Sequence, residues 1–230
     1  MIQDPENRYI ETILANCDIR GKVILEIGCG KGRVTRDLAE HARRVTATDP
    51  DAAALATARL ALAADNVEFL HAQTGVPDLP AGSFDTAIYT LSLHHVPPGE
   101  MSGSLHKVAS LLREGGTIVI VEPDDGGSLT EAKERFGAGS GDERPAREAA
   151  VRAMHSLAGW SVGETVRFRT SFRFDDEEDF LVNLLPDYRV RPAAVLGEIR
   201  AFLDRHRSPD GIVLHAGRRL NVLKKNIRKE

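Results

Sequence analysis

Short apolar runs alternate with segments of helical periodicity through the first half of the chain. Runs rich in β-branched and aliphatic residues are typical of buried strands. They lie at residues 22–28, 44–49, 67–72, within 84–95, and at 117–123. Between them, apolar residues recur at helical spacing over 6–17, 33–42, 51–64 and 99–114. This alternation predicts an α/β fold with a doubly wound parallel sheet and helices on both faces.

The pattern changes after Pro123. Residues 137–145 are polar and rich in glycine, which predicts a loop between two helices. Residues 165–174 alternate strictly between apolar and basic side chains, as expected of a half-exposed strand near a sheet edge. Helices are predicted over 175–185, which opens with acidic residues, and over 193–206. A last strand, paired antiparallel, is predicted over 211–225.

Composition supports one folded domain without a strong attraction to nucleic acid. The chain has 230 residues, 42% of them hydrophobic, and a formal net charge of −4. That length suits one α/β domain with additions. The acidic balance disfavours a nucleic-acid partner. The basic segment 218–230 is therefore interpreted as a solvated end of the chain.

Cysteine content and hydropathy point to the cytoplasm. The two cysteines, Cys17 and Cys29, are typical of a reduced compartment. The opening MIQDPENRYI is polar and lacks the apolar stretch of a signal peptide. No apolar run reaches the roughly 18 residues of a membrane span, so no membrane contact is expected.

A glycine-rich turn follows the first long apolar run. The stretch reads E-x-G-x-G-x-G, with Glu26, Gly28, Gly30 and Gly32 at alternate positions. A dinucleotide site of the form G-x-G-x-x-G needs its third glycine for close packing of helix on strand. Arg33 occupies that position, which disfavours a nicotinamide-dependent oxidoreductase.

The spacing of this turn resembles the first motif of the class I S-adenosylmethionine-dependent methyltransferases. The resemblance extends over residues 20–123 and is strongest to the type 11, small-molecule group. It implies a Rossmann-like, mostly parallel seven-stranded sheet with an antiparallel last strand and helical cap insertions. It also implies a single methyltransferase domain over 1–230, with S-adenosyl-L-methionine as cofactor and no metal.

The resemblance assigns the cofactor contacts. Glycines without Cβ atoms let backbone approach the ligand, and backbone N–H groups at the helix start can meet its carboxylate. Glu26 favours the cationic end of the cofactor, and Asp49 would accept the ribose hydroxyls. The alternative for Asp49 is a helix N-cap for 51–64, a role that Asp51 could also fill.

The remaining cofactor contacts follow the other strand ends. Relatives carry an acidic residue near the adenine where this chain has Gln73, so either the amide or the backbone of Ala72 and Thr74 would read the base. Thr90 and Leu91 would line the cofactor. The full predicted set is Glu26, Gly28, Cys29, Gly30, Gly32, Asp49, Pro50, Gln73, Thr74, Thr90 and Leu91.

Two adjacent histidines are the candidate catalytic residues. His94 and His95 follow the fourth strand, where a neutral imidazole could take a proton from a hydroxyl acceptor. The alternative is that one of them packs beneath the loop at 96–98. Methyl transfer needs little acid–base help, because the sulfonium is already an activated leaving group.

Segments beyond the minimal fold are candidates for acceptor binding. Residues 124–160 and 175–210 are interpreted as a lid and acceptor pocket, with movement at 137–141; tolerated surface insertions are the alternative. Ordinary packing is expected for Tyr9 and for Trp160 in the core.

The leading hypothesis is methyl transfer from S-adenosylmethionine to a small organic acceptor. A non-catalytic cofactor-binding module is the first alternative, and an RNA or protein methyltransferase the second. The N/D-P-P-Y motif of enzymes that methylate bases or glutamine side chains is absent. The sequence leaves the acceptor atom and the oligomeric state open.

Overall fold

The computed structural model describes residues 1–226, and the chain divides into two compact units. The core unit comprises Ile10–Glu122, Pro145–Val166 and Arg219–Glu230, and the second unit comprises Met1–Tyr9, Pro123–Arg144 and Arg167–Arg218. Two long strands, β8 (Val166–Phe174) and β10 (Gly211–Lys225), contain residues of both units.

Five parallel strands form the centre of the core unit. They are β2 (Val23–Ile27), β3 (Arg44–Asp49), β4 (Val67–His71), β5 (Phe84–Thr90) and β6 (Leu112–Pro123). Their order in the sheet is β6-β5-β2-β3-β4, and each neighbouring pair is parallel. The predicted doubly wound parallel arrangement is confirmed. The predicted number of seven strands is wrong, because within residues 1–226 the sheet contains ten strands.

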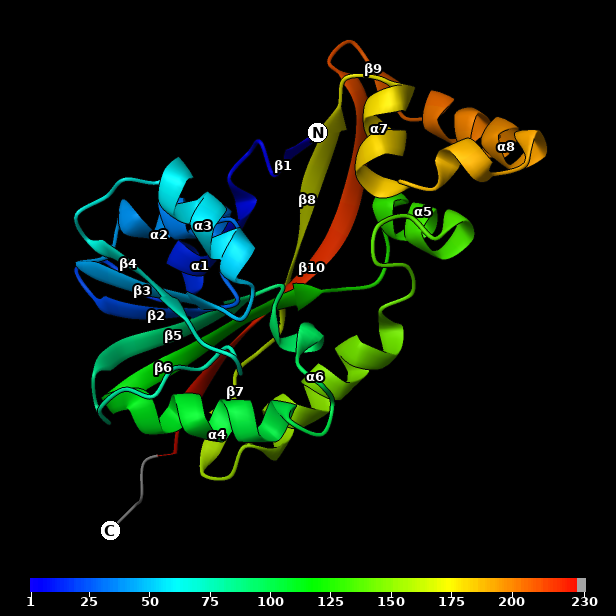
Figure 1. Cartoon of the computed structure of the whole chain (residues 1–230). Coiled ribbons are helices and arrows are strands. Elements are labelled where there is room, and N and C mark those ends of the chain that lie inside the picture. Colours follow the sequence, from blue (N-terminus) through cyan, green and yellow to red (C-terminus); the bar gives the residue numbers. More distant parts are fainter. Residues whose placement is uncertain (227–230) are drawn as a thin grey trace. The chain divides into compact units, whose positions relative to one another are not determined.

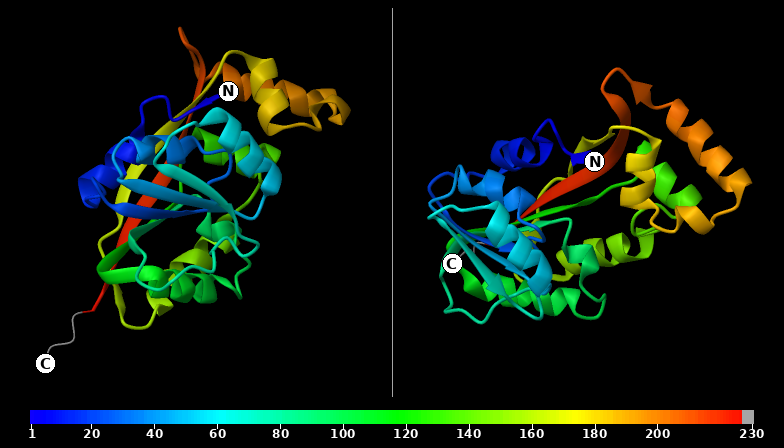
Figure 2. Two further views of the ribbon diagram at one scale, coloured as in Figure 1. Left: turned by 60° about the vertical axis from the view of Figure 1, so that its left-hand side comes forward. Right: turned by 45° about the horizontal axis from the view of Figure 1, so that its top comes forward.

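Helices cover both faces of this sheet. Figures 1 and 2 show α2 (Arg33–Ala39) and α3 (Ala52–Ala61) on one face, and α4 (Met101–Leu111) and α6 (Arg144–Ser156) on the other. Strand β2 is buried along its whole length because it contacts both layers. Leu25 packs into the hydrophobic cluster that includes α4 and α6, and Glu26 points to the α2 side and bonds to Thr35.

Shorter elements complete the core unit. Helix α1 (Arg8–Asn16) contributes the buried side chains of Ile10 and Ile13. The strand β7 (Trp160–Val162) pairs antiparallel with the end of β10, and Trp160 packs against the core cluster as predicted. A 3-10 turn, η1 (Leu93–His95), follows β5.

The second unit has its own hydrophobic core. Strand β1 (Ile2–Gln3) pairs antiparallel with β8, and β9 (Arg207–Ser208) pairs antiparallel with the start of β10. Its helical elements are α5 (Ser128–Phe136), α7 (Glu177–Leu184), η2 (Tyr188–Val190) and α8 (Ala193–Asp204). Edge-to-face ring pairs fix its centre, with 5.5 Å between the centroids of Phe136 and Phe202 and 5.3 Å between those of Phe174 and Phe180.

Alternation along the last two long strands decides which basic residues are exposed. In β8, Arg167 and Arg169 are exposed while Phe172 is buried, as predicted. The expectation that 218–230 is solvated is wrong for Arg218, which is only 6% exposed. Leu220 and its neighbours in β10 are also buried, because this segment is a strand inside a sheet. Residues 227–230 of that prediction lie outside the described part. Within 1–226, no helix combines the length and the apolar character needed to cross a membrane.

Candidate functional site

The carboxyl ends of the parallel strands meet at one edge of the core unit. The chain runs from β2 to β3 and β4 on one side, then returns to β5 on the other side of β2. Ligands of open α/β sheets bind at such a reversal of strand order. Here the loop after β2 lies at this point, beside the end of β5, and both carry predicted site residues.

Two glycines in the turn after β2 serve different purposes. Gly28 has a φ of +74°, and a Cβ atom at this position would collide with the side chain of Ser92 after β5. Ser92 is held there because its hydroxyl donates a hydrogen bond of 2.6 Å to the carbonyl of Ile27. Gly30 has a φ of +54°, and a Cβ atom on it would meet no described atom within 4 Å. The turn is thus packed against β5 at Gly28 and open to a ligand at Gly30.

Asp49 stabilises the same turn from the neighbouring strand. Its carboxylate accepts the backbone N–H of Gly30 at 2.7 Å and that of Asp51 at 2.8 Å. The N-cap of α3 is Asp51, whose side chain accepts the N–H groups of Ala53 and Ala54. Asp49 therefore does not cap α3, and its oxygens retain lone pairs for further donors. Its ribose role stays a prediction.

Glu26 is a buried acid directly beneath the turn. It is 2% exposed, and its Oε2 accepts a hydrogen bond of 2.6 Å from the Thr35 hydroxyl. Burial raises the pKa of Glu26 to about 7, and the Thr35 hydrogen bond and Arg33 partly oppose that shift. The side chain is therefore poised to gain or lose a proton near neutral pH.

The end of β5 presents a buried hydroxyl that has no partner. Among the described residues, no group hydrogen-bonds the buried Oγ1 of Thr90. Leu91 has a φ of +56°, which is unusual for a residue with a side chain, and its N–H donates to the carbonyl of Val121 at 2.8 Å. Strained backbone and an unpaired polar atom side by side are typical of a ligand site.

The predicted adenine contacts lie on an exposed loop after β4. Gln73 and Thr74 are exposed and help to line a surface depression of about 500 Å³. Pro50 is exposed, and its carbonyl lies 3.0 Å from Nε2 of His71. Cys29 is buried in the turn, and burial raises the pKa of its thiol, so this residue is no nucleophile at neutral pH.

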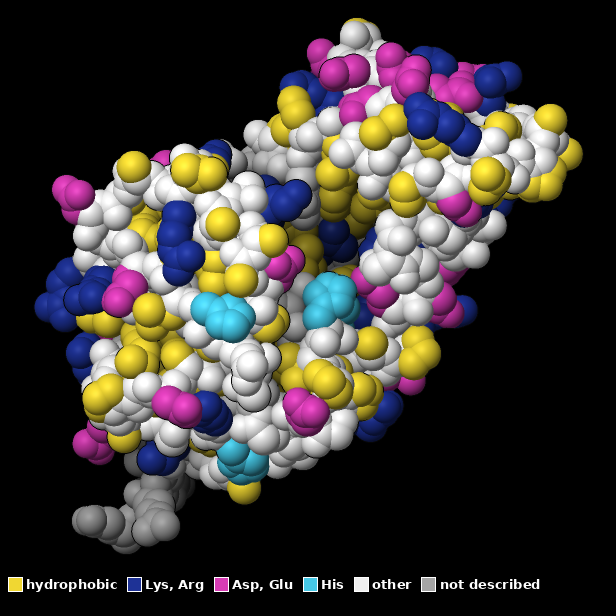
Figure 3. Space-filling view, viewed as in Figure 1, with side chains coloured by type: hydrophobic (Ala, Val, Ile, Leu, Met, Phe, Trp, Pro, Cys, Tyr) yellow, Lys and Arg dark blue, Asp and Glu magenta, His cyan; other side chains and the backbone are white. Residues whose placement is uncertain are grey.

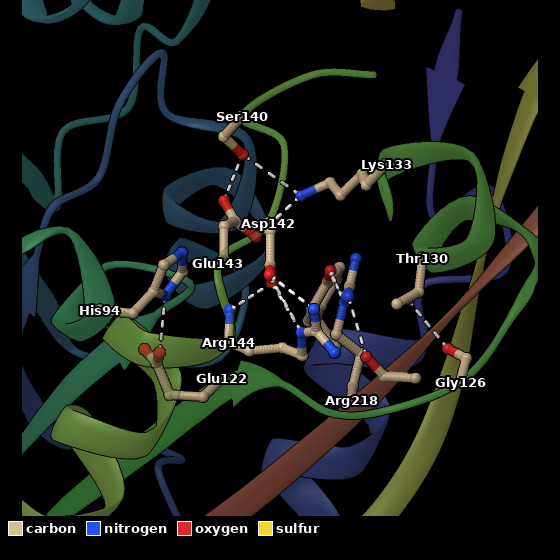
Figure 4. A network of polar contacts seen from close by, with 12 residues as sticks. His94, Glu122, Gly126, Thr130, Lys133, Ser140, Asp142, Glu143, Arg144 and Arg218 are labelled. Atoms are coloured by element: carbon tan, nitrogen blue, oxygen red, sulfur yellow. Dashed lines mark hydrogen bonds and ion pairs between the residues drawn. The ribbon is translucent and has the colours of Figure 1, made fainter. Parts of the chain in front are cut away.

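The two histidines after β5 have different environments. His94 is buried, and its Nδ1 lies 2.6 Å from the Glu122 carboxylate at the end of β6 (Figure 4). Glu122 also accepts the N–H of Leu93 at 3.1 Å. His95 is exposed, and the two imidazole centroids are 4.0 Å apart. The alternative in which one histidine packs beneath the loop therefore fits the burial of His94, and it leaves the catalytic assignment open.

Sequence reasoning missed Ser92 and Glu122. Ser92 follows β5, and Glu122 lies near the end of β6. The carboxyl ends of these parallel strands lie at the edge of the sheet where ligands bind, and this position is the signal that could have identified both residues. Glu122 lies directly before Pro123, where the predicted strand stops. An acidic residue at that position is exceptional in a strand of apolar neighbours.

Comparisons of sequence and of structure find known proteins that are similar to this chain. Residues 24–116 match a family described as "Methyltransferase domain". An uncharacterized methyltransferase of Geobacillus kaustophilus is 30% identical over 156 residues, covering 66% of this chain and 64% of that protein. A ubiquinone biosynthesis O-methyltransferase of Nitrosococcus oceani is 34% identical over 113 residues, which is 47% of each chain.

The chain belongs to the class I S-adenosylmethionine-dependent methyltransferases through residues 24–116. It spans about half the length of most curated relatives that it matches, such as 49%, 52% and 47% of three of them. Two solved structures share the fold of this methyltransferase domain. An S-adenosylmethionine dependent methyltransferase from Mesorhizobium loti is 20% identical, with a TM-score of 0.51 over 93% of this chain and 97% of that one. The [4+2]-cyclase SpnF is 17% identical, with a TM-score of 0.60 over 96% and 82%.

The cofactor of this family is S-adenosylmethionine, and the residues present fit it. Gly30 leaves the backbone of the turn open to close approach. The unpaired hydroxyl of Thr90 supplies a polar atom that a ligand could satisfy. The Glu26 carboxyl suits the cationic amino group of the cofactor when it is ionised.

Proposed function

We propose that this protein transfers a methyl group from S-adenosylmethionine to a hydroxyl oxygen of a small organic acceptor. The observation that carries the proposal is the turn after β2, where Asp49 bonds the N–H of Gly30 beside the unpaired hydroxyl of Thr90. This arrangement lies at the reversal of strand order, the usual ligand position of such sheets. A named relative that methylates oxygen supports the choice of acceptor atom.

Each predicted residue is proposed to contact a particular part of the cofactor. Gly28, Gly30 and Gly32 bring backbone to its amino acid end, Glu26 faces its cationic amino group, and Asp49 holds its ribose. Gln73 and Thr74 contact the adenine. The positions of these residues along one sheet edge support this division, with Cys29, Pro50, Thr90 and Leu91 as lining.

His94 is the proposed general base, with Glu122 as its positioning residue. The Glu122 carboxylate can only accept when ionised, so the 2.6 Å contact places the imidazole proton on Nδ1. Nε2 of the neutral ring then has the lone pair that takes the proton of the acceptor hydroxyl. When bound, the cofactor supplies a methyl group activated by a sulfonium. Exposed His95, whose ring is tilted by 43° against that of His94, is the second candidate.

The partner is proposed to be a small molecule and not a nucleic acid. The chain has 30 basic against 34 acidic residues, and Figure 3 shows the two kinds of side chain interspersed over the visible face. A nucleic-acid enzyme would need a continuous basic surface. The second unit, which includes residues 124–144 and all of 175–210, is proposed to select the acceptor.

Calorimetry with S-adenosylhomocysteine tests the cofactor site. We expect saturable binding, which Asp49→Ala weakens by more than tenfold, because the variant loses the ribose contact and the bond that fixes Gly30. Asp51→Ala is the matched control: it removes a carboxylate two residues away that only caps α3. That control should bind normally and lose about 1 kcal/mol of stability. Equal binding by the Asp49 variant and the wild type would remove the ribose assignment.

Turnover separates an enzyme from a non-catalytic module. The fold also occurs in a protein named a [4+2]-cyclase, so binding of the cofactor alone does not establish methyl transfer. We expect methylated product from at least one member of a panel of phenols, catechols and hydroxy acids. Cofactor binding without any product across amine, thiol and hydroxyl acceptors would favour the non-catalytic alternative.

A further inference from the structure

Arg218 is a buried cation on β10 in the second unit. Its side chain belongs to a residue that is 6% exposed. Nε donates to the hydroxyl of Tyr9 at 2.6 Å, and Nη1 donates to the carbonyl of Gly217 at 2.9 Å. The guanidinium carbon lies 5.8 Å from the ring centroid of Tyr9 and 5.6 Å from that of Phe172. Within residues 1–226, both hydrogen-bond partners of this guanidinium are neutral oxygens.

Several other cations of the same unit are paired with carboxylates. Figure 4 shows Arg218 with two such pairs, Lys133 with Glu143 at 2.8 Å and Arg144 with Asp142 at 2.7 Å. Exposed Arg200 bonds Glu177 at 2.9 Å. These three cations have carboxylate partners, whereas the more deeply buried Arg218 has no counter-ion among the described residues.

A second polar group without a hydrogen-bond partner lies on β8, the strand next to β10. Thr170 in β8 is 1% exposed, and its Oγ1 has no hydrogen-bond partner among the described residues. Phe168 and Phe172, two residues away on either side, share its strand face because side chains alternate along a strand. Phe172 contacts Arg218, and the ring of Phe168 meets that of Tyr9 edge-on at 5.9 Å. Thr170 therefore lies on the strand face that contacts Arg218 and Tyr9.

A buried charge without a partner is costly, and so is a buried hydroxyl without one. Two of the five guanidinium N–H groups are used, so three remain for an oxyanion, including the pair on Nη2. We propose that Arg218, Tyr9 and Thr170 form a binding site for an anionic oxygen group, a carboxylate or a phosphate, of a small organic molecule.

Titration with small anions tests the site. The probes are benzoate, its neutral counterpart benzamide, and inorganic phosphate, each measured by calorimetry at neutral pH. We expect saturable benzoate binding and at least tenfold weaker benzamide binding. Stronger binding of phosphate than of benzoate would assign the site to phosphate-bearing molecules, and the reverse order would assign it to carboxylates.

Variants separate a binding role from a structural one. Arg218→Met should weaken benzoate binding at least tenfold while melting no lower than the wild type, because it removes an uncompensated buried charge. Thr170→Val, of nearly equal size, should weaken it severalfold. Arg200→Met is the matched control, since it removes an exposed, paired arginine of the same unit, and it should bind benzoate normally.

The outcomes also distinguish this inference from the proposed function. Equal benzoate affinity in the wild type and Arg218→Met, or no saturable anion binding by the wild type, would overturn the inference. A marked drop in melting temperature of Arg218→Met without any anion effect would mean a purely structural arginine. S-adenosylhomocysteine binding is measured on the same samples, and its absence would refute the cofactor proposal while leaving an observed benzoate site intact.

Discussion

A single carboxyl group, that of Glu26, links the fold to the binding of a charged ligand. It lies in the fully buried strand β2 and keeps one hydroxyl partner, Thr35. Burial raises the pKa of Glu26 to about 7, with Asp37 and Asp49 adding to the rise and Arg33 opposing it. The acid is thus largely neutral at pH 6 and largely ionised at pH 8. Because a cationic ligand group favours the ionised form, binding and deprotonation should be coupled.

We expect the affinity for S-adenosylhomocysteine to rise by about tenfold between pH 6 and pH 8, as a group with a pKa near 7 must lose its proton on binding. Calorimetry at pH 6.5 in two buffers of different ionisation enthalpy should show release of up to one proton. Glu26→Gln removes the ionisation, so its affinity should be weaker and nearly independent of pH over this range.

A pH-independent affinity in the wild type would contradict that coupling. The Asp51→Ala variant controls for general effects of pH on the turn, because it leaves Glu26 and its Thr35 partner in place. It should keep the pH dependence of the wild type. Loss of the dependence in both variants would point to a titrating group other than Glu26.

At the scale of elements, long periodic segments were predicted well and short ones were not. The last strand was predicted over the residues that β10 occupies, and the expected parallel strands are β2 to β6. Strands β1, β7 and β9 have two or three residues each, too few to show any periodicity. They depend on pairing with β8 and β10, which no local pattern encodes.

Site residues could be predicted only where they belong to one local sequence motif. The glycine turn and Asp49 follow from spacing and from the strand that each one ends. The contact of His94 with Glu122 joins η1 to the end of β6, 28 positions along the chain, and depends on how β5 and β6 align. Arg218 was misjudged because a basic side chain near the end of a sequence suggests solvent, whereas its position inside a sheet buries it.

The contact between η1 and β6 gives a test of catalysis. Glu122→Gln keeps the size of the side chain but removes the charge that holds the His94 proton on Nδ1. Once an acceptor is known, we expect kcat to fall by about 10²-fold with KM little changed, the scale of general-base catalysis. The pH profile of kcat should also shift, because the imidazole loses its anionic neighbour.

Affinity for S-adenosylhomocysteine is the control for that variant. The affinity of Glu122→Gln should match that of the wild type, since Glu122 contacts His94 and Leu93 rather than the glycine turn. Glu122→Asp, which restores the charge at a shorter reach, should recover part of the lost rate. Unchanged kcat and pH profile in Glu122→Gln would leave the residue a structural role only.

At the scale of the whole molecule, the two units have separate hydrophobic clusters. That of the core unit includes Ile118 in β6, and that of the second unit includes Phe202 in α8, both fully buried. No residue of the described part of the chain belongs to both clusters. A change in one cluster should therefore act first on the stability of its own unit.

Two conservative core substitutions test whether cofactor binding depends on one unit alone. Phe202→Leu and its matched partner Ile118→Val should each cost about 1 kcal/mol. For Phe202→Leu we expect faster amide hydrogen exchange within 123–144 and 167–218, with unchanged affinity for S-adenosylhomocysteine. For Ile118→Val the faster exchange should appear in β2, β5 and β6 instead. Exchange that rises equally in both units for either variant would mean that they unfold as one cooperative body, joined through the continuous strands β8 and β10.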